Sequence, residues 1–175
     1  MARTLIVRPF LAAEWRLYRE LRLRSLADSP DAFGSTLALE QGRADEHWAQ
    51  RLAGGCDGAA WNLAVLAQVD GQGAGLAWGR IEPERPDAAN LYQMWVAPQA
   101  RGMGAGGKLL DAVITWAALR RVRTLYLGVT CGETPAQRMY ARAGFRAVGS
   151  PELLRADSTL LAQNMQLDLP PVVNA

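Results

Sequence analysis

The sequence LYQMWVAPQARGMGAGGKLL, residues 91–110, decides the fold of this chain. It opens on LYQMWV, a run of aromatic and other β-favouring side chains. Pro98 ends this strand, because proline cannot donate a hydrogen bond to a strand ladder. Four glycines follow within six residues, at positions 102, 104, 106 and 107. From Leu109 onward apolar residues recur at helical spacing, so the stretch predicts a strand, a glycine-rich loop and a helix in succession.

Glycines at the start of a helix suit the binding of an anion. Without Cβ atoms, their backbone N–H groups can approach a ligand closely. The first N–H groups of a helix also lack internal partners, and they lie at the positive end of the helix dipole. The glycine-rich loop and the helix start therefore predict a phosphate-binding site.

Two nucleotide-binding loops match this string only in part. Read as G-x-x-x-x-G-K, residues 102–108 approach the P-loop, but Leu109 stands where Ser or Thr must bind magnesium. Read as G-x-G-x-x-G, the glycines match the dinucleotide fingerprint, which needs an acidic residue at the end of the next strand. That strand is expected at 124–129 and is followed by Thr130 and Cys131, so the acid is missing. Too little chain follows to complete a doubly wound sheet.

A third pattern, Arg/Gln-x-x-Gly-x-Gly/Ala, is filled by Arg101, Gly104 and Gly106. Downstream, ETPAQRMYARAGF (133–145) is similar to Asn-x-x-Ala-x-x-x-Tyr-x-x-x-Gly-Phe, with Glu133 in place of the usual Asn. The matching residues are Ala136, Tyr140, Gly144 and Phe145. In this order and spacing the two motifs resemble those of the GCN5-related N-acetyltransferases. The resemblance covers about residues 60–168, and the N-terminal third only loosely.

Hydrophobic periodicity and turn residues predict the other elements. Strands are expected at 4–7, 61–69, 74–81, 91–96, 124–129, 145–148 and 161–168, and helices at 12–26, at 44–53, from the glycine loop to 121, and at 134–143. Asp70-Gly71 is a strong hairpin signal, and the segment 82–90, with two prolines, is expected to be a polar loop. The β-α-β crossover predicts a parallel pair of the strands 91–96 and 124–129.

Two of these elements are expected to bury a single face. On the strand 61–69 that face carries Trp61, Leu63, Val65, Ala67 and Val69. On the first helix it carries Leu17, Tyr18, Leu21 and Ser25, with Arg16, Arg19 and Arg22 off it.

Composition favours one globular domain, because 50% of the 175 residues are apolar and 21% are charged. A net charge of +2 gives no case for nucleic acid. No window approaches the roughly 18 apolar residues of a membrane span, and MARTLIVRPF is too short and too charged for a signal peptide. We therefore expect a cytoplasmic protein without a membrane partner. Cys56 and Cys131 match no metal or redox spacing, and no metal is expected.

The resemblance implies the acyl-CoA N-acyltransferase fold. This is an α/β (α+β) architecture with a mixed, mostly antiparallel sheet, a central splayed pair of parallel strands, and flanking helices. Residues 1–169 are expected to form one such domain, and residues 170–175 to fray. Family habit favours a homodimer.

The resemblance also implies where acetyl-CoA binds. Its pantetheine arm is expected between the splayed strands, on backbone groups of Met94, Trp95 and Val96. The pyrophosphate is expected on the loop, without magnesium. That loop comprises Arg101, Gly102, Met103, Gly104, Ala105, Gly106, Gly107 and Lys108. Ala136 and Glu133 belong to the second motif, where an ionised Glu133 can only accept the hydrogen bonds that an Asn would also donate.

Tyr140 is the catalytic candidate. Thr134 can cap its helix, Pro135 suits the first helical position, and Gly144 suits the end of the helix. A phenol with a reference pKa near 10 keeps its proton at neutral pH and can give it to the departing thiolate of CoA. The alternative is an aromatic core residue whose hydroxyl finds a local partner.

Three residues are candidates for the acceptor side: Phe33, Asn90 and Gln93. The resemblance places an aromatic at the segment between the first two helices near substrate, although Phe33 can equally be a core anchor. Many relatives have a Glu where this chain has Asn90, which cannot act as a base. Water relays to Glu82, Glu84 or Asp87 are open alternatives to solvated surface charges, and His47 is expected at the surface.

The resemblance predicts an acetyl-CoA-dependent N-acetyltransferase that moves an acetyl group to an unidentified amine acceptor, by direct attack in a ternary complex. Proximity of the two reactants would supply much of the rate, and the amides of Trp95 and Val96 could polarise the thioester carbonyl. The alternative is a CoA-binding sensor or partner module of the same fold without efficient catalysis. A third reading is a nucleotide-binding protein.

Overall fold

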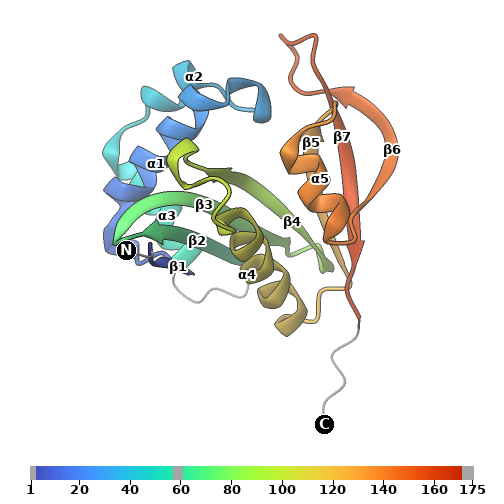
Figure 1. Ribbon diagram of the computed structural model, residues 1–175, viewed down its shortest axis with the longest axis horizontal. Coiled ribbons are helices and arrows are strands. Elements are labelled where there is room, and N and C mark those ends of the chain that lie inside the picture. Colours follow the sequence, from blue (N-terminus) through green and yellow to red (C-terminus); the bar gives the residue numbers. More distant parts are fainter. Residues whose placement is uncertain (1–2, 57–60, 171–175) are drawn as a thin grey trace.

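The computed structural model describes residues 3–56 and 61–170, and these form one seven-stranded sheet in the order β1-β2-β3-β4-β5-β7-β6 (Figure 1). The strands are β1 (Leu5–Pro9), β2 (Asn62–Val69), β3 (Gln72–Glu82), β4 (Arg85–Val96), β5 (Thr124–Thr130), β6 (Arg146–Leu153) and β7 (Leu161–Asp168). The helices are α1 (Trp15–Asp28), α2 (Leu37–Gln41), α3 (Asp45–Cys56), α4 (Ala105–Leu119) and α5 (Pro135–Arg142), with 3-10 turns η1 (Ala12–Glu14), η2 (Pro30–Ala32) and η3 (Pro98–Ala100). The predicted mixed fold is confirmed.

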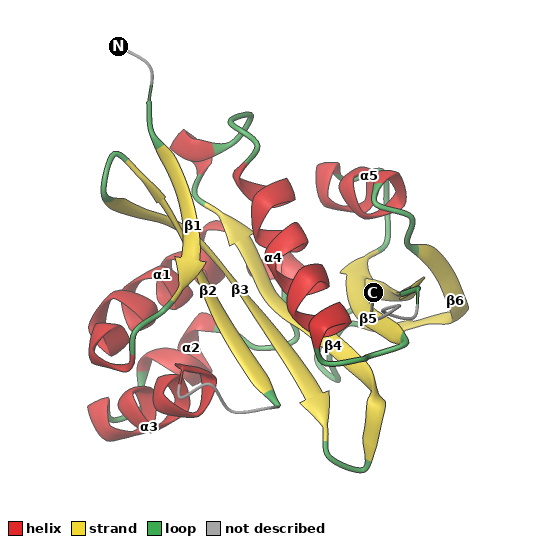
Figure 2. Cartoon of the chain, turned by 90° about the horizontal axis from the view of Figure 1, so that it is seen from below, coloured by secondary structure: helices red, strands yellow, loops and turns green. Residues whose placement is uncertain are grey.

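Helices cover both faces of the sheet. Figure 2 shows α1, α2 and α3 on one side, with α4 and α5 on the other. Side chains of β2 alternate between the two resulting cores: Val65 packs in the core with α4, whereas Leu66 packs in the core with α1 and α3. The strand therefore buries both of its faces, whereas only one buried face was predicted. Trp61, expected on that face, lies outside β2 and is 39% exposed.

The predicted hairpin at Asp70-Gly71 joins β2 to β3. Both residues have positive φ, 52° and 78°, which suits the twist of a two-residue hairpin. The Asp70 carboxylate also accepts a hydrogen bond from the backbone N–H of Thr4 at 2.8 Å. This contact ties the turn to the segment that enters β1.

The expected polar loop at 82–90 is wrong. Strand β4 begins at Arg85, so only Pro83 and Glu84 separate it from β3. Ala89 is fully buried, and it pairs with Ile81 on one side and with Leu125 on the other. Pro83 lies in a turn as expected, but Pro86 lies inside β4, where the small residues Ala88 and Ala89 pair with β5 and extend the strand.

The predicted parallel pairing of two strands is confirmed, but it uses an earlier part of β4 than expected. Strands β4 and β5 pair from Ala88 opposite Thr124 to Leu91 opposite Leu127. The pairing thus uses the half of β4 that precedes the expected strand 91–96. Beyond Leu91, β4 continues to Val96 while bonded only to β3.

A short helix, α2, was not predicted. It spans five residues, too few to show a helical period, and Thr36 caps it by accepting a hydrogen bond from the Leu39 N–H at 3.3 Å. Helix α2 and turn η2 both pack on α1. As a result Arg22, expected off the buried face of α1, is only 4% exposed.

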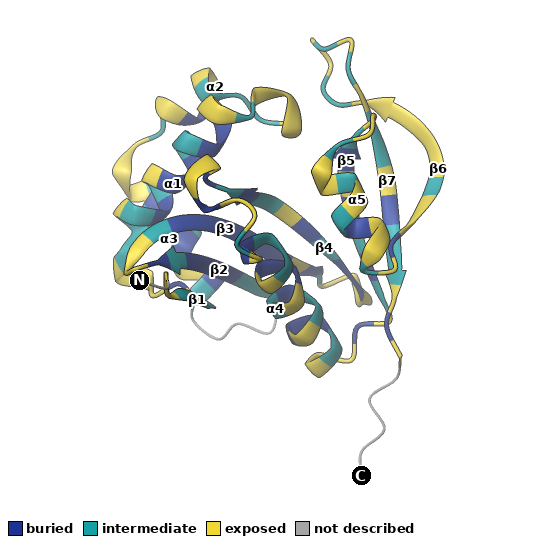
Figure 3. Cartoon of the chain, in the orientation of Figure 1, coloured by how far each residue is buried: buried dark blue, intermediate teal, exposed yellow. Residues whose placement is uncertain are grey.

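The remaining differences concern element ends. Strand β1 includes Pro9, α1 runs on to Asp28, and β6 extends to Leu153. Strand β6 pairs only with β7, is exposed along most of its length (Figure 3), and carries Gly149 at φ 66° and Pro151 where its register shifts. Within the described ranges, no helix is both long and apolar enough to cross a bilayer. Of the tail expected to fray, 171–175 lie outside the described residues.

We predict that Gly79→Ala destabilises the protein by about 1–3 kcal/mol, because the site is already filled. A Cβ at this position of β3 would lie 2.7 Å from the Trp116 ring and 3.1 Å from a methyl group of Val113. Urea unfolding gives the change in the free energy of unfolding.

The matched control is Gly128→Ala in β5, where the nearest atom to a new Cβ is the Asn164 side-chain oxygen at 3.7 Å, an ordinary contact. This variant should be neutral or up to about 1 kcal/mol more stable. Equal stability of the two variants would contradict close packing of α4 on β3.

Candidate active site

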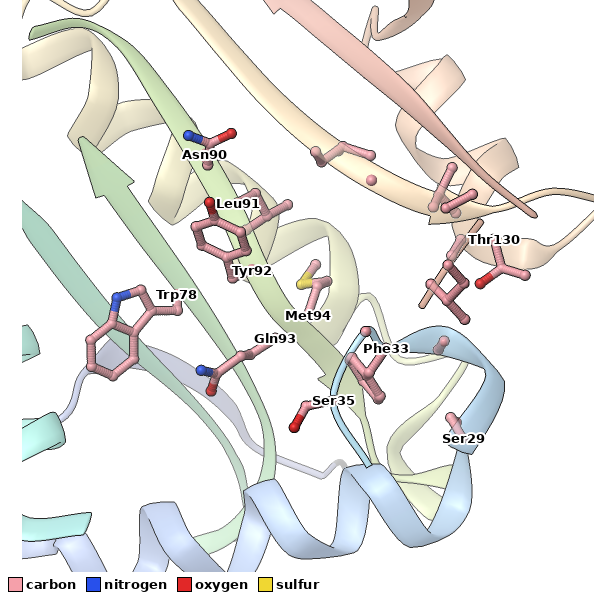
Figure 4. Close-up of a pocket in the computed structure, with 18 of the residues that line it drawn as sticks. Ser29, Phe33, Ser35, Trp78, Asn90, Leu91, Tyr92, Gln93, Met94 and Thr130 are labelled. Carbon is pink, nitrogen blue, oxygen red and sulfur yellow. The ribbon is translucent and has the colours of Figure 1, made fainter. Parts of the chain in front are cut away.

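A cavity of about 1220 Å³ lies where β4 and β5 separate. Figure 4 shows its walls: Asn90 to Met94 project from β4, Thr130 comes from β5, and Phe33 and Ser35 come from the segment between α1 and α2. The lining also includes residues of α1, α2, α3, β2, β3 and α5 and of the β6–β7 hairpin. The cavity therefore lies between the two halves of the sheet. Its lining includes the three acceptor-side candidates, Phe33, Asn90 and Gln93, and the catalytic candidate Tyr140.

The splayed strands leave backbone groups available at this cavity. In the described chain, β4 and β5 share no pairing beyond Leu91 and Leu127, although both strands continue. Buried backbone N–H and C=O groups normally find partners. An extended ligand that carries amide groups can supply them along 92–96 in the manner of an added strand.

Gln93 sits at the irregularity that ends this pairing. Its φ of 55° is uncommon for a residue with a side chain and costs on the order of 1 kcal/mol. The β3–β4 register shifts at the same place, as in a bulge that bends a strand. The Gln93 side-chain oxygen accepts a hydrogen bond from the hydroxyl of the fully buried Tyr18 at 2.9 Å, which holds this conformation.

The glycine loop leads directly into α4. Gly102 and Gly104 have φ of 76° and 82°, a conformation that favours glycine. Gly104 is the N-cap of α4 and has no side chain to cap the first amides. Gly107 is helical, and a Cβ there would meet no atom within 4 Å. Packing among the described residues therefore does not explain this glycine.

Arg101 and Trp95 link this loop to the end of α1. The Arg101 guanidinium forms an ion pair with Asp28 and donates to the Val96 carbonyl at 3.0 Å. The Trp95 indole N–H donates to the same Asp28 carboxylate at 2.9 Å. Hydrogen bonds from Trp95 and Ser29, together with Arg101, hold the pKa of Asp28 below its ordinary value. One carbonyl expected to face the ligand arm, that of Val96, is thus already bonded to Arg101.

Tyr140 occupies α5 as its motif predicts. The Thr134 hydroxyl caps α5 by accepting from the Gln137 N–H at 3.1 Å, and the helix is closed by Gly144 at φ 96°. The Tyr140 ring is 5% exposed, lines the cavity and stacks edge-on against Phe145.

Burial raises the pKa of the Tyr140 hydroxyl, so the phenol stays protonated at neutral pH. In the part of the chain that the structure describes, this hydroxyl has no hydrogen-bond partner. Its oxygen is not completely enclosed by protein atoms. The local partner expected of a purely structural tyrosine is therefore absent from the described residues.

The structure brings together only part of the predicted site. Of the predicted residues, the cavity is lined by Phe33, Asn90, Gln93, Met94, Ala136 and Tyr140. Outside this lining lie Trp95, Val96, the loop from Arg101 to Lys108, and Glu133. Glu133 is exposed, and its backbone carbonyl accepts from Arg138 at 3.0 Å. His47 also lies outside the lining, with its ring edge-on to Trp48.

The carboxylates considered as bases lie away from the cavity floor. Glu84 and Asp87 are exposed, whereas Glu82 pairs with Arg80 at 3.0 Å. Glu82 lines a second cavity of about 370 Å³ that shares Asn90 with the first. No group of three or more His, Cys, Asp or Glu residues that could hold a metal occurs within the described ranges.

A charged cluster that the sequence did not reveal forms one end of the cavity. Glu40 is 2% exposed and accepts hydrogen bonds from Arg51 at 3.0 Å and Ser35 at 2.9 Å, with Arg43 at 3.3 Å. Burial alone would raise the pKa of Glu40, but Arg51, the Ser35 hydroxyl and the other arginines hold it below its ordinary value. The five-residue helix that carries Glu40 gave no signal in the sequence, so the cluster was missed.

Comparison with known proteins agrees with this arrangement. A model of the acetyltransferase (GNAT) family matches residues 15–145. A mycothiol acetyltransferase of Cellulomonas flavigena is 31% identical over 136 residues, which are 73% of this chain and 36% of that protein. An L-2,4-diaminobutyric acid acetyltransferase of Nocardia farcinica is 30% identical over 82 residues, 47% of this chain and 42% of that protein. The chain spans between about a third and two fifths of these relatives' length.

Solved structures share the fold. A putative acetyltransferase of Salmonella typhimurium, solved with its cofactor acetyl-CoA, superposes with a TM-score of 0.79 at 16% identity and covers 98% of both chains. A ribosomal-protein-alanine N-acetyltransferase of Brucella melitensis gives a TM-score of 0.73 at 24% identity, over 94% of this chain and 99% of that one.

We predict that Glu40→Gln lowers the free energy of unfolding by about 3 kcal/mol at pH 7, because it leaves the surrounding guanidinium groups without a counter-charge. The folded pKa of Glu40 is lowered, so its contribution is complete above the unfolded pKa and is lost as pH falls through the folded pKa. The gap between wild type and variant should therefore shrink below about pH 4.3 in urea titrations. A gap that does not depend on pH would contradict an ionised Glu40.

We predict that Gly107→Ala raises stability but weakens acetyl-CoA binding. Alanine is favoured over glycine inside a helix by up to about 1 kcal/mol, and the site has room for a Cβ, whereas a phosphate close to the backbone would meet the new methyl group. Thermal unfolding and calorimetric titration measure the two effects.

Gly42→Ala is the control, since Gly42 lies at the end of α2 with φ −82° and open space around it. It should leave the Kd of acetyl-CoA unchanged. Unaltered binding in Gly107→Ala would remove this residue from the cofactor site.

Proposed function

This chain belongs to the acetyltransferase (GNAT) family, and we propose that it moves an acetyl group from acetyl-CoA to an amine. The observation that carries the proposal is the separation of β4 from β5 beyond Leu91 and Leu127, with Tyr140 beside the resulting cavity. An unpaired strand edge, a glycine-rich helix start and a protonated phenol are what a thioester donor with a phosphate-bearing carrier requires. The Nocardia farcinica relative, by its name, acetylates an acceptor that has amino groups.

The backbone of 92–96 binds the amide-containing arm of acetyl-CoA in this proposal. Such binding holds the thioester next to the cavity, while the amides from Gly102 to Gly107 hold the pyrophosphate. The first-turn amides of α4 carry partial positive charge, so the loop needs no magnesium. Lys108, exposed on the same helical turn, adds a positive charge. Glu133, which is exposed, can only accept hydrogen bonds from the arm when it is ionised.

The amine attacks the thioester carbonyl directly when both substrates are bound. The nitrogen–carbon bond forms, the carbon–sulfur bond breaks, and Tyr140 gives its proton to the departing thiolate. The proton that the amine nitrogen loses passes to solvent water, from which Tyr140 is protonated again. Because burial raises the pKa of Tyr140, the proton is present throughout the neutral range. Asp28 and Glu40 line the same cavity but are held ionised by their ion pairs, so neither is suited to take the proton of the amine.

The acceptor binds in the same cavity, whose lining includes Phe33, Asn90 and Gln93. Phe33 is 8% exposed. Gln93 is held by Tyr18 and so presents a fixed backbone to the acceptor rather than a mobile amide.

We predict that Tyr140→Phe lowers kcat by about 10²- to 10⁴-fold, the usual contribution of a positioned acid, while the Kd of CoA stays within about twofold. A thiol-release assay and calorimetric titration measure the two quantities. Leu119→Ala, at an exposed position of α4, is a control for nonspecific loss. A CoA-binding module without catalysis would bind acetyl-CoA as tightly and show no turnover in the wild type.

A second measurement compares the thermal unfolding of the wild type in the presence of acetyl-CoA, CoA, ATP or NAD. A ligand of the native state raises the melting temperature by mass action. Stabilisation by ATP or NAD, and none by CoA, would falsify the proposal.

A further inference from the structure

Arg22 is buried at the cavity without the partners that a buried charge normally has. It lies on α1 one turn after Tyr18, is 4% exposed, and lines the cavity. Its guanidinium carbon lies 4.8 Å from the centre of the Phe33 ring, so the aromatic face fixes the plane of the group.

Two nitrogens of Arg22, Nε and Nη1, are enclosed and have no hydrogen-bond partner. In the described part of the chain, Arg22 takes part in no ion pair within 4.0 Å. Removing an ionised group from water without hydrogen bonds is costly, and fully buried arginines are almost always paired. Burial accordingly lowers the pKa of Arg22.

The neighbouring carboxylate does not satisfy this group. Glu40 is bonded to Arg51, Arg43 and Ser35. With Arg22 included, three guanidinium groups share one carboxylate, so this end of the cavity carries excess positive charge.

The other charges at the cavity that were described above are paired. Asp28 is held by Arg101, and Arg80 by Glu82. Among the described residues that line the cavity, Arg22 is the one whose side chain has enclosed, unpartnered nitrogens. The unmet hydrogen-bonding capacity of the cavity lining is therefore localised at Arg22 on α1.

We propose that Arg22 binds a carboxylate of the acceptor, so that the acceptor is an amino acid or another amine that carries a carboxylate. This inference rests on the proposed acetyl transfer and names its substrate class. A planar guanidinium can form two parallel hydrogen bonds with a carboxylate, once the side chain turns so that its enclosed nitrogens face the cavity. Arg22 is the guanidinium at this cavity that has no ion-pair partner among the described residues, and a carboxylate supplies that partner.

The geometry also orders the acceptor along the cavity. Its carboxylate lies at Arg22 on α1, and its amine points toward Tyr140 on α5, since both residues line the same cavity. The number of bonds between amine and carboxylate must then match the distance across the cavity. One chain length should be acetylated best.

The test is a ladder of acceptors with paired end groups. The acids are 3-aminopropanoate, 4-aminobutanoate, 5-aminopentanoate and 6-aminohexanoate, each compared with its primary carboxamide. At the best length, wild type should prefer the acid over the amide by about tenfold or more in kcat/KM, the effect of a hydrogen-bonded charge pair. Most of the preference should appear in KM.

Arg22→Met keeps the length of the side chain and removes its charge. It should bring the ratio of acid to amide close to one and leave kcat on the amides within about twofold. Arg16→Met, on an exposed face of the same helix and outside the cavity, should behave as wild type. Arg22→Lys, which keeps the charge without the planar fork, should retain only part of the preference.

Thermal unfolding with the same acids supplies a readout independent of turnover, and it also reports whether Arg22→Met is folded. Stabilisation of wild type by the acids and not by the amides, lost in Arg22→Met, supports the inference even if no acceptor is acetylated, a result that would refute the proposed function alone. Equal use of acids and amides by an active wild type, or a preference for 2-aminoethyl phosphate over every acid, overturns the inference while acetyl transfer stands.

Discussion

The end of the β4–β5 ladder at Leu91 and Leu127 is the constraint on which the rest of the molecule depends. Two parallel strands in the middle of a sheet would ordinarily satisfy each other's backbone groups along their whole length. Here β4 keeps its β3 partner to the end and stays in one half of the sheet, while β5 pairs with β7 in the other half. The bulge at Gln93, held by Tyr18, makes this separation part of the fold.

Contacts around Asp28 connect β4 and the glycine loop to the end of α1. Its carboxylate receives Trp95 from β4 and Arg101 from the glycine loop, and it lies at the last residue of α1. Helix α1 also carries Arg22 on the acceptor side. A shift of the glycine loop on cofactor binding would therefore be felt at the end of the helix that presents Arg22.

Much of the fold follows from sequence, because strand residues, the hairpin at Asp70-Gly71 and the caps around Tyr140 act locally. The burial of Ala89 did not follow, since two prolines signal a turn and only the neighbouring strands decide where that turn ends. The burial of Arg22 was not predicted for a related reason. A helical wheel assumes one buried face, whereas α1 is covered both by the sheet and by the segment that contains α2. The role of Arg22 depends on a helix too short to predict.

Strand β6 has a consequence for the behaviour of the protein at high concentration. A sheet edge offers unpaired backbone groups to any other chain and so invites aggregation. Pro151 has no N–H to offer, and the irregularity between Val148 and Glu152, with Gly149 in a left-handed conformation, bends the edge away from an ideal strand. The open side of this sheet is thus a poor template for a second copy. Replacing Gly149 and Pro151 with β-branched residues would make this edge better able to pair with another chain, and the protein more prone to aggregate.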